Sequence, residues 1–212
     1  MAFDLEEQEQ LDELKAWWDR WGTLVSIAIA GALAATAGWQ WWRNHQATQA
    51  AQAAVIFDRL DQAAEAGDDK VAREIGGMII DKYAGTGYAP RAALILAGVN
   101  LSLNDSKSAR AQLEWAIEHA RDPGLKDLAR LRLAAVLLDA KEYDAAMSQL
   151  NAAHSDAFAP RFNDLKGDVL MAEGKAQEAK AAYDAAYKAL DEKNPLRQLV
   201  GFKLDALGGP AK

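Results

Sequence analysis

The sequence WGTLVSIAIAGALAATAGWQWW, residues 21–42, is an uncharged stretch bounded by Arg20 and Arg43. As an α-helix, its 22 residues would extend about 33 Å, which is enough to cross a bilayer hydrocarbon core of about 30 Å. The stretch therefore predicts a transmembrane helix over residues 21–42, in contact with the lipid bilayer.

Tryptophan placement favours the same interpretation. Six of the seven tryptophans lie at the two ends of the stretch. Indole rings prefer the headgroup layer, where an apolar body and one N–H donor are both satisfied. A buried helix of a soluble protein would not need this arrangement, and a cleaved signal peptide has an apolar core of only about 7–15 residues. The expected membrane-interface anchors are Trp17, Trp18, Trp21, Trp39, Trp41 and Trp42.

The flanking charges do not decide the orientation. Residues 1–20 carry seven acidic and two basic side chains, and residues 43–212 carry the remaining −2 of the net charge of −7. The positive-inside rule counts Lys15 and Arg20 on one side against Arg43 and Arg59 on the other, which is nearly a tie. The acidic segment 1–20 predicts either a docking segment for a partner or a solvated tail.

Composition excludes several classes of function. The chain has no cysteine, so thiolate metal sites, disulfides and cysteine nucleophiles are excluded. No basic stripe is present that could neutralise phosphates, which argues against nucleic-acid binding. The three histidines are not spaced as metal ligands, and no phosphate-binding or nucleophile-elbow motif occurs. We therefore expect no enzyme activity, no cofactor and no metal.

Beyond residue 42 the pattern predicts helical hairpins. Residues 43–86 are expected to form a membrane-proximal hairpin that ends at the turn 85–87. Residues 87–193 show a 34-residue period, in which Ala111, Ala145 and Ala179 coincide at a small-residue position. This period is typical of tetratricopeptide repeats, which stack into a solenoid. Residues 194–212 are expected to form a C-terminal capping helix and tail.

The predicted fold is thus all-α: a single N-terminal transmembrane helix followed by a tetratricopeptide-like α-solenoid of helical hairpins. Such a solenoid offers a groove lined by the first helix of each hairpin, which commonly binds peptides or partner helices. The candidate partner-binding residues in this groove are Arg91, Asn100, Arg130, Arg132 and Asp168.

The order of these parts resembles the YfgM family of ancillary subunits of the SecYEG translocon. The similarity lies in the acidic stretch EEQEQLDELKAWW, the exit GWQWWRNHQ, and the segments DLARLRLAAVLLDAKEYDAAMSQL and LKGDVLMAEGKAQEAKAAYDAAY. The resemblance implies a bacterial inner-membrane protein with a cytoplasmic N-terminus and a periplasmic C-terminal domain. It also implies association with SecYEG and with a PpiD-like periplasmic chaperone, and a role in helping newly translocated, unfolded secretory clients.

Two other functions remain open on the residues alone. The chain could be a scaffold of another bacterial envelope assembly machine, or an adaptor whose repeats lie in the cytosol. Identification of the partners would distinguish a scaffold of another envelope machine from a translocon subunit. The location of the repeat domain would distinguish a cytosolic adaptor from a protein with periplasmic repeats.

Overall fold

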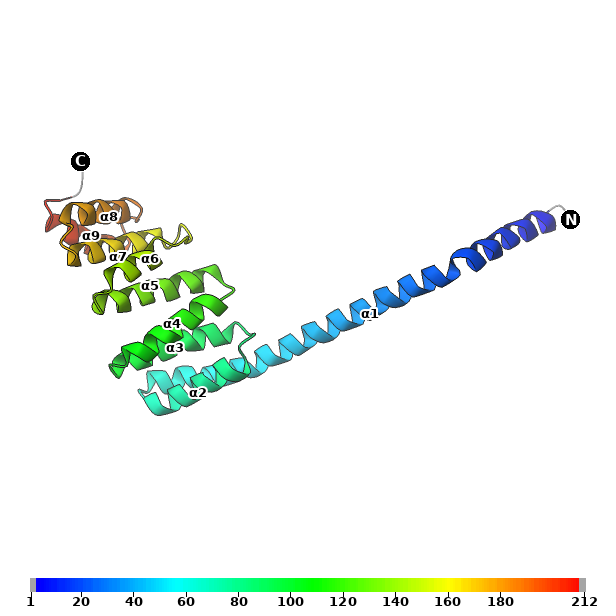
Figure 1. Cartoon of the computed structure of the whole chain (residues 1–212), viewed down its shortest axis with the longest axis horizontal. Coiled ribbons are helices and arrows are strands. Elements are labelled where there is room, and N and C mark those ends of the chain that lie inside the picture. The colour runs from blue at the N-terminus through cyan, green and yellow to red at the C-terminus, as the bar shows by residue number, and fades with distance from the viewer. Residues whose placement is uncertain (1–2, 210–212) are drawn as a thin grey trace. The chain divides into compact units, whose positions relative to one another are not determined.

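The structure, a computed structural model, describes residues 3–209, with side chains from residue 10 onward. The described residues form helices and turns with no strand, and the predicted all-α fold is confirmed. Residues 1–2 of the acidic segment and 210–212 of the tail lie outside this range. The helices are α1 (Phe3–Glu65), α2 (Asp69–Lys82), α3 (Tyr88–Ser102), α4 (Ser106–His119), α5 (Pro123–Asp139), α6 (Tyr143–Leu150), α7 (Ala159–Ala172), α8 (Ala176–Lys188) and α9 (Pro195–Asp205) (Figure 1).

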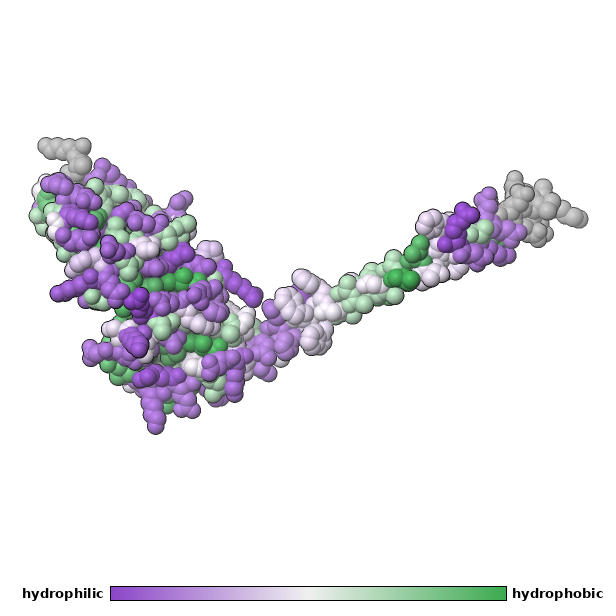
Figure 2. All heavy atoms as spheres, in the orientation of Figure 1, coloured by the Kyte–Doolittle hydropathy of each residue, from purple (hydrophilic) through white to green (hydrophobic). Residues whose placement is uncertain are grey.

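The chain divides into two compact units, residues 1–48 and 49–212. Among the described residues, α1 is the one helix that is long and apolar enough to cross a membrane, and its apolar stretch, residues 21–42, lies in the first unit. The six tryptophans at the ends of the apolar stretch 21–42 are all exposed, as lipid-facing anchors would be. Figure 2 shows an apolar band along this helix with hydrophilic residues on either side.

The second unit is a series of helical hairpins, in which residues 49–65 of α1 pair with α2, α3 with α4, α5 with α6, and α7 with α8. Each first helix ends in the same turn, a Schellman motif built around one residue with positive φ. In every turn, the amide of this residue donates to the carbonyl three residues earlier, at 2.9–3.2 Å. The following amide donates to the carbonyl five residues before it, at 2.8–2.9 Å. The four turn residues are Gly67, Asn104, Lys141 and Gly174.

These turns define a repeat register that differs from the predicted one. The turn residues are spaced 37, 37 and 33 positions apart, rather than uniformly 34. The predicted small-residue position was therefore wrong in two of three repeats, since Ala111 is exposed and Ala145 is only half-buried. The position that recurs is five residues after the turn residue. There an alanine is fully buried in all four hairpins: Ala72, Ala109, Ala146 and Ala179.

Small residues bring the helices into close contact at two further points. A Cβ added to Gly76 on α2 would lie 2.6 Å from the side chain of Leu96 on α3. A Cβ added to Gly167 on α7 would lie 2.3 Å from the ring of Tyr183 on α8. Both distances are shorter than the contacts that Cβ atoms make in proteins, so a larger residue at either position would force the neighbouring side chain to move.

Helix α9 closes the series on the side of α8. Val200 and Leu204 are fully buried and pack with Leu170, Ala179 and Tyr183. This is the packing expected of a helix that covers the apolar side of the last hairpin, and it removes those side chains from water.

Asn100 provides a stability prediction. It is 4% exposed and lies four residues before its turn residue, where the other first helices carry Ala63, Leu137 and Leu170. Its Oδ1 accepts no hydrogen bond from any described residue. Because an unpaired buried carbonyl costs about 1–3 kcal/mol, we expect Asn100→Leu to raise the free energy of unfolding by about 1 kcal/mol or more. Chemical denaturation checks this, and unchanged or lower stability would show that the amide is satisfied in solution.

Candidate partner-binding surface

The first helices of consecutive hairpins leave one stripe of side chains uncovered. These positions lie nine, six and three residues before each turn residue, a spacing that keeps them on one side of a helix. We call this set the first-helix face. All nine of its members are exposed or half-buried: Ile95, Gly98, Leu101, Arg132, Ala135, Leu138, Leu165, Asp168 and Met171.

The first-helix face is mainly apolar. Helix α3 contacts α5, and α5 contacts α7, so the three stripes form one surface. Leu101 is 40% exposed and Met171 is 41% exposed, at equivalent positions of α3 and α7. Arg132 and Asp168 are its only charged members. Such a surface suits apolar or amphipathic segments of a partner, since burying each large side chain contributes about 1.5–3 kcal/mol.

Two of the five predicted groove residues belong to the first-helix face, and a third borders it. Arg132 is exposed and donates from Nη1 to the carbonyl oxygen of Leu94 at 3.2 Å, which links α5 to α3. Asp168 is half-buried and accepts hydrogen bonds from α8 and α9. Arg91 is exposed one turn before Ile95 and extends the stripe on α3.

The other two predicted residues do not line the groove. Asn100 is buried between helices and cannot contact a partner. Arg130 donates to the carbonyl oxygen of Ala153 at 2.8 Å and lies 3.8 Å from Asp127, so it holds a loop of its own domain. The prediction that these two residues line the groove was wrong, because it followed from residue type and an incorrect repeat register.

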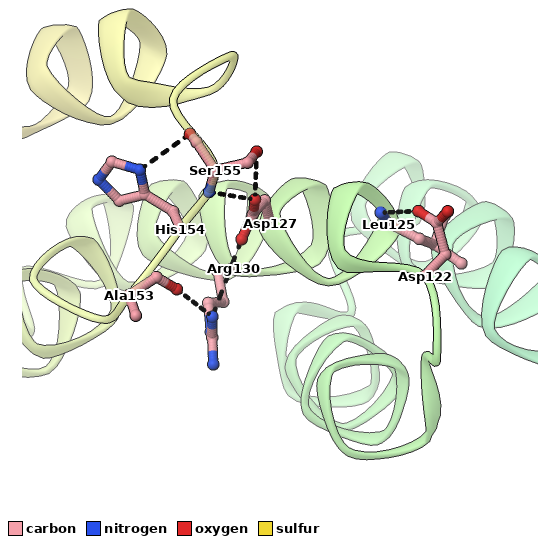
Figure 3. Close-up of polar contacts among 7 residues, drawn as sticks. All are labelled: Asp122, Leu125, Asp127, Arg130, Ala153, His154 and Ser155. Atoms are coloured by element: carbon pink, nitrogen blue, oxygen red, sulfur yellow. Dashed lines mark hydrogen bonds and ion pairs between the residues drawn. The ribbon is translucent and has the colours of Figure 1, made fainter.

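Asp127 anchors the loop between α6 and α7, a role that the sequence did not suggest. It is 2% exposed, and its Oδ2 accepts hydrogen bonds from the amide and the hydroxyl of Ser155, both at 2.9 Å. Figure 3 shows Asp127 and Arg130 on α5 reaching this loop from one side. Helix α6 has only 8 residues, against 13 or 14 for the other second helices. In a longer α6, hydrogen bonds within the helix would satisfy the next backbone groups. Here the Asp127 carboxylate accepts from the Ser155 amide, and the Arg130 guanidinium donates to the Ala153 carbonyl oxygen.

A charged cluster ties α9 to α7 and α8. The Lys203 ammonium lies 2.7 Å from Asp164 Oδ1 and 2.9 Å from Asp168 Oδ2. The Tyr183 hydroxyl donates to Asp168 Oδ1 at 2.7 Å. Burial opposes the charge on Lys203, but these carboxylates outweigh burial and raise its pKa. Burial, followed by the hydrogen bond to Asp168, also raises the pKa of Tyr183.

This cluster predicts a loss of stability at alkaline pH. Because the folded-state pKa values of Lys203 and Tyr183 are raised, their contribution is complete below about pH 10 and decreases as each group deprotonates. Each proton contributes up to about 1.4 kcal/mol per pH unit to this decrease. Burial raises the pKa of Asp164 as well, but that effect acts in the acid range.

We expect the free energy of unfolding to fall as the pH rises from about 10 to about 12, above the ordinary pKa values of these groups, and to fall less steeply in Lys203→Met/Tyr183→Phe. Denaturant titrations at several pH values check the slope. Equal slopes in the two proteins would contradict the role of the cluster.

The described side chains show no group of three histidine or acidic residues that could hold a metal ion. A cavity of about 420 Å³ lies beside Arg91, between the loops that precede α3 and α5. It is lined by loop backbone, Arg91, His119 and Arg121, and His119 is stacked on Trp115 at 4.0 Å. Thr86 also lines the cavity, but its hydroxyl donates to the carbonyl oxygen of Tyr83 at 2.8 Å, and Nδ1 of His119 lies 2.9 Å from the carbonyl oxygen of Trp115.

The fold and its surface define a class: helical-repeat interaction proteins with an N-terminal apolar helix. Residues 15–209 match the family described as "Tetratricopeptide repeat-like domain". The names of similar proteins are more specific. An ancillary SecYEG translocon subunit of Neisseria gonorrhoeae is 30% identical over 209 residues, which cover 98% of this chain and all of that protein.

Proteins with the same name in Haemophilus influenzae and Escherichia coli are 29% and 28% identical over 207 and 205 residues. These alignments cover 98% and 95% of this chain, and 100% and 96% of those proteins. The chain belongs to the family of ancillary SecYEG translocon subunits, and the resemblance drawn from its sequence is confirmed.

Proposed function

We propose that this protein is a non-enzymatic, membrane-anchored subunit associated with the SecYEG translocon of the bacterial inner membrane. Its repeat domain lies in the periplasm and binds partner chaperones or newly translocated proteins. The names of the relatives support the association with SecYEG, and the apolar segment of α1 supports the anchor. The fold and those names describe an adaptor rather than an enzyme family.

The observation that carries this proposal is the first-helix face. Leu101, Leu138 and Met171 occupy the same position in three successive hairpins and remain accessible to solvent. Exposed apolar residues that recur along a solenoid form a continuous surface for an extended or helical partner. Unfolded secretory proteins and a PpiD-like chaperone are partners of suitable chemistry, because both can present apolar segments.

A purification of the full-length protein from cells tests the role of this surface. We expect Leu101→Glu/Met171→Glu to lose chaperone and client proteins while retaining SecYEG, which we assign to the membrane unit. Met78→Glu is the matched control, because Met78 is 37% exposed on α2 and lies off the first-helix face. Unchanged recovery of chaperones and clients in the double variant would reject the surface. Recovery of a different envelope machine in place of SecYEG would reject the translocon assignment.

The proposed orientation places residues 1–20 in the cytoplasm and residues 49–212 in the periplasm. Because the chain has no cysteine, one introduced thiol reports its location without background. Ser148 is exposed on α6, so Ser148→Cys is a suitable probe. We expect a membrane-impermeant maleimide to label it once the outer membrane alone is permeabilised. Labelling only after the inner membrane is lysed would place the repeats in the cytosol.

A further inference from the structure

Helix α9 repeats the register of the earlier first helices. Its turn residue is Gly208, which has a positive φ of 90°, and the two hydrogen bonds of the Schellman turn are again present. Leu204 and Val200, four and eight residues before Gly208, are fully buried. The equivalent residues of α5, Leu137 and Leu133, are buried as well. Helix α9 therefore turns the same side toward the core as α5 does.

The opposite side of α9 carries the positions that form the first-helix face in α3, α5 and α7. Leu199, Phe202 and Asp205 lie nine, six and three residues before the turn residue, and all three are exposed. Phe202 is 64% exposed and Leu199 is 50% exposed, more than Leu101 or Met171. The helix that was expected only to cap the repeats thus presents the most exposed large apolar side chains at these positions.

The first-helix face is continued at both ends. The Lys203 ammonium on α9 lies 2.9 Å from Oδ2 of Asp168, a member of that face on α7. At the other end, the ring of Phe57 on α1 lies 5.5 Å from that of Tyr88 on α3, between ring centroids. We call the face with both additions the extended face. Its added members are Asp58, Asp61 and Ala64, at the same positions before Gly67, and Leu199, Phe202 and Asp205.

The spacing of the first helices favours a helical partner. Packed helix axes lie about 10 Å apart. A partner helix laid across them rises 1.5 Å per residue, so it meets the next first helix after about seven residues, almost two full turns, with the same side facing the protein. An extended strand would meet it after about three residues, and successive contacts would then fall on opposite sides of the strand. Four such steps, from α1 to α9, correspond to about 27 residues of helix.

The two ends of the extended face are acidic. The two aspartates on α1 and Asp205 on α9 are exposed, and none of them forms an ion pair with a described residue. Asp168 is already paired with a lysine, and Arg132, near the middle, donates to a backbone carbonyl. Arg91 and Arg161 lie outside the extended face, thirteen residues before their turn residues. An occupant with basic residues at its ends is therefore complementary in charge.

We propose that the extended face binds an amphipathic helix of a partner protein, apolar along one side and basic at both ends, and that α9 anchors one end of it. Leu199 and Phe202 contact the apolar side of this helix, since aromatic and aliphatic side chains supply most of the burial at interfaces. Asp205, one turn beyond Phe202, pairs with a basic residue at the end of the helix. This inference rests on the proposed function, because it specifies the segment that the repeat domain binds.

A synthetic peptide tests the proposal with the full-length protein in nanodiscs of neutral phosphatidylcholine. The probe is a fluorescent amphipathic helix of about 28 residues, with leucines along one side and lysines at both ends. Fluorescence anisotropy measures binding, after subtraction of binding to empty nanodiscs. We expect this peptide to bind more tightly than one with glutamates at both ends. It should also bind more tightly than a peptide of the same composition with leucines at alternate positions, which suits a strand.

Substitution of Phe202 tests the role of α9. Phe202→Glu should weaken binding of the lysine-ended peptide about tenfold or more, since burial of the ring is lost. Leu101→Glu/Met171→Glu should weaken it as well, and Met78→Glu, off the face, should not. Because Phe202 is exposed, its replacement leaves the fold intact, which circular dichroism checks.

The outcomes separate this inference from the proposed function. Weaker binding in Leu101→Glu/Met171→Glu but not in Phe202→Glu would overturn the role of α9 and leave the first-helix face in place. Equal or tighter binding of the glutamate-ended or alternating peptide, or no binding of the lysine-ended one, would overturn the proposed partner chemistry. Binding of the lysine-ended peptide that none of these variants weakens would reject the face itself, and with it the surface named in the proposed function.

Discussion

Replacing Gly167 with alanine is expected to lower the free energy of unfolding by about 2–4 kcal/mol. The added methyl group would lie 2.3 Å from the ring of Tyr183 and must displace it. That displacement also breaks the hydrogen bond from the Tyr183 hydroxyl to Asp168 and disturbs the Lys203 cluster that holds α9. Thermal and denaturant unfolding of the full-length protein in detergent measure the loss.

Gly98 is the matched control for this substitution. It is also a helical glycine of a first helix, six residues before its turn residue, but a Cβ added there meets no atom within 4 Å. Since alanine favours a helix over glycine by about 1 kcal/mol, Gly98→Ala should be neutral or slightly stabilising. Similar effects at Gly98 and Gly167 would contradict the register of the hairpins.

Removing residues 21–42 is expected to convert a membrane protein into a soluble one. The apolar stretch 21–42 is long enough to span the hydrocarbon core. Almost all of its side chains are exposed, so they are free to contact lipid. Residues 49–212 form a compact unit with their own buried cores and should remain folded.

Alkaline extraction of membranes and centrifugation measure this change. The intact chain should sediment with the membranes, and the shortened chain should remain in the supernatant. A replacement span of 22 leucine and alanine residues, equal in length to residues 21–42, is the control and should restore membrane retention. Retention of the shortened chain would show that another part of the protein holds it to the bilayer.

The general architecture could be predicted from the sequence for clear physical reasons. An uncharged stretch flanked by tryptophans has few alternatives to a membrane helix, and an alanine-rich chain with few prolines favours packed helices. The family could be recognised for a different reason: the acidic stretch, the apolar stretch, the tryptophan-rich exit and the repeats follow one another in the order typical of that family.

The repeat register could not be predicted, because its marker changes identity along the chain. Gly67 and Gly174 are readable as turn residues, but Asn104 and Lys141 hold the same left-handed conformation. Without them, a uniform 34-residue period placed the small-residue position at Ala111 instead of Ala109. A shift of two residues rotates a side chain about 200° around the helix, from the core to the solvent.

The same rotation explains the errors in the groove. Asn100 was expected to face a partner, yet its distance from Asn104 places it in the interior. Arg130 and Asp127 act across 23 and 28 residues of sequence, on a loop whose position depends on the short helix α6. Such contacts depend on tertiary structure, and no local pattern in the sequence indicates them.

Site-specific photocrosslinking in intact cells tests the central claim most directly. One probe replaces Ala34 in the apolar stretch and one replaces Arg132 on the first-helix face, with products identified by mass spectrometry. We expect SecYEG subunits at the first probe, and a periplasmic chaperone or an unfolded secretory protein at the second. Cytosolic proteins at the second probe would contradict the account, because they would reverse the orientation of the repeat domain.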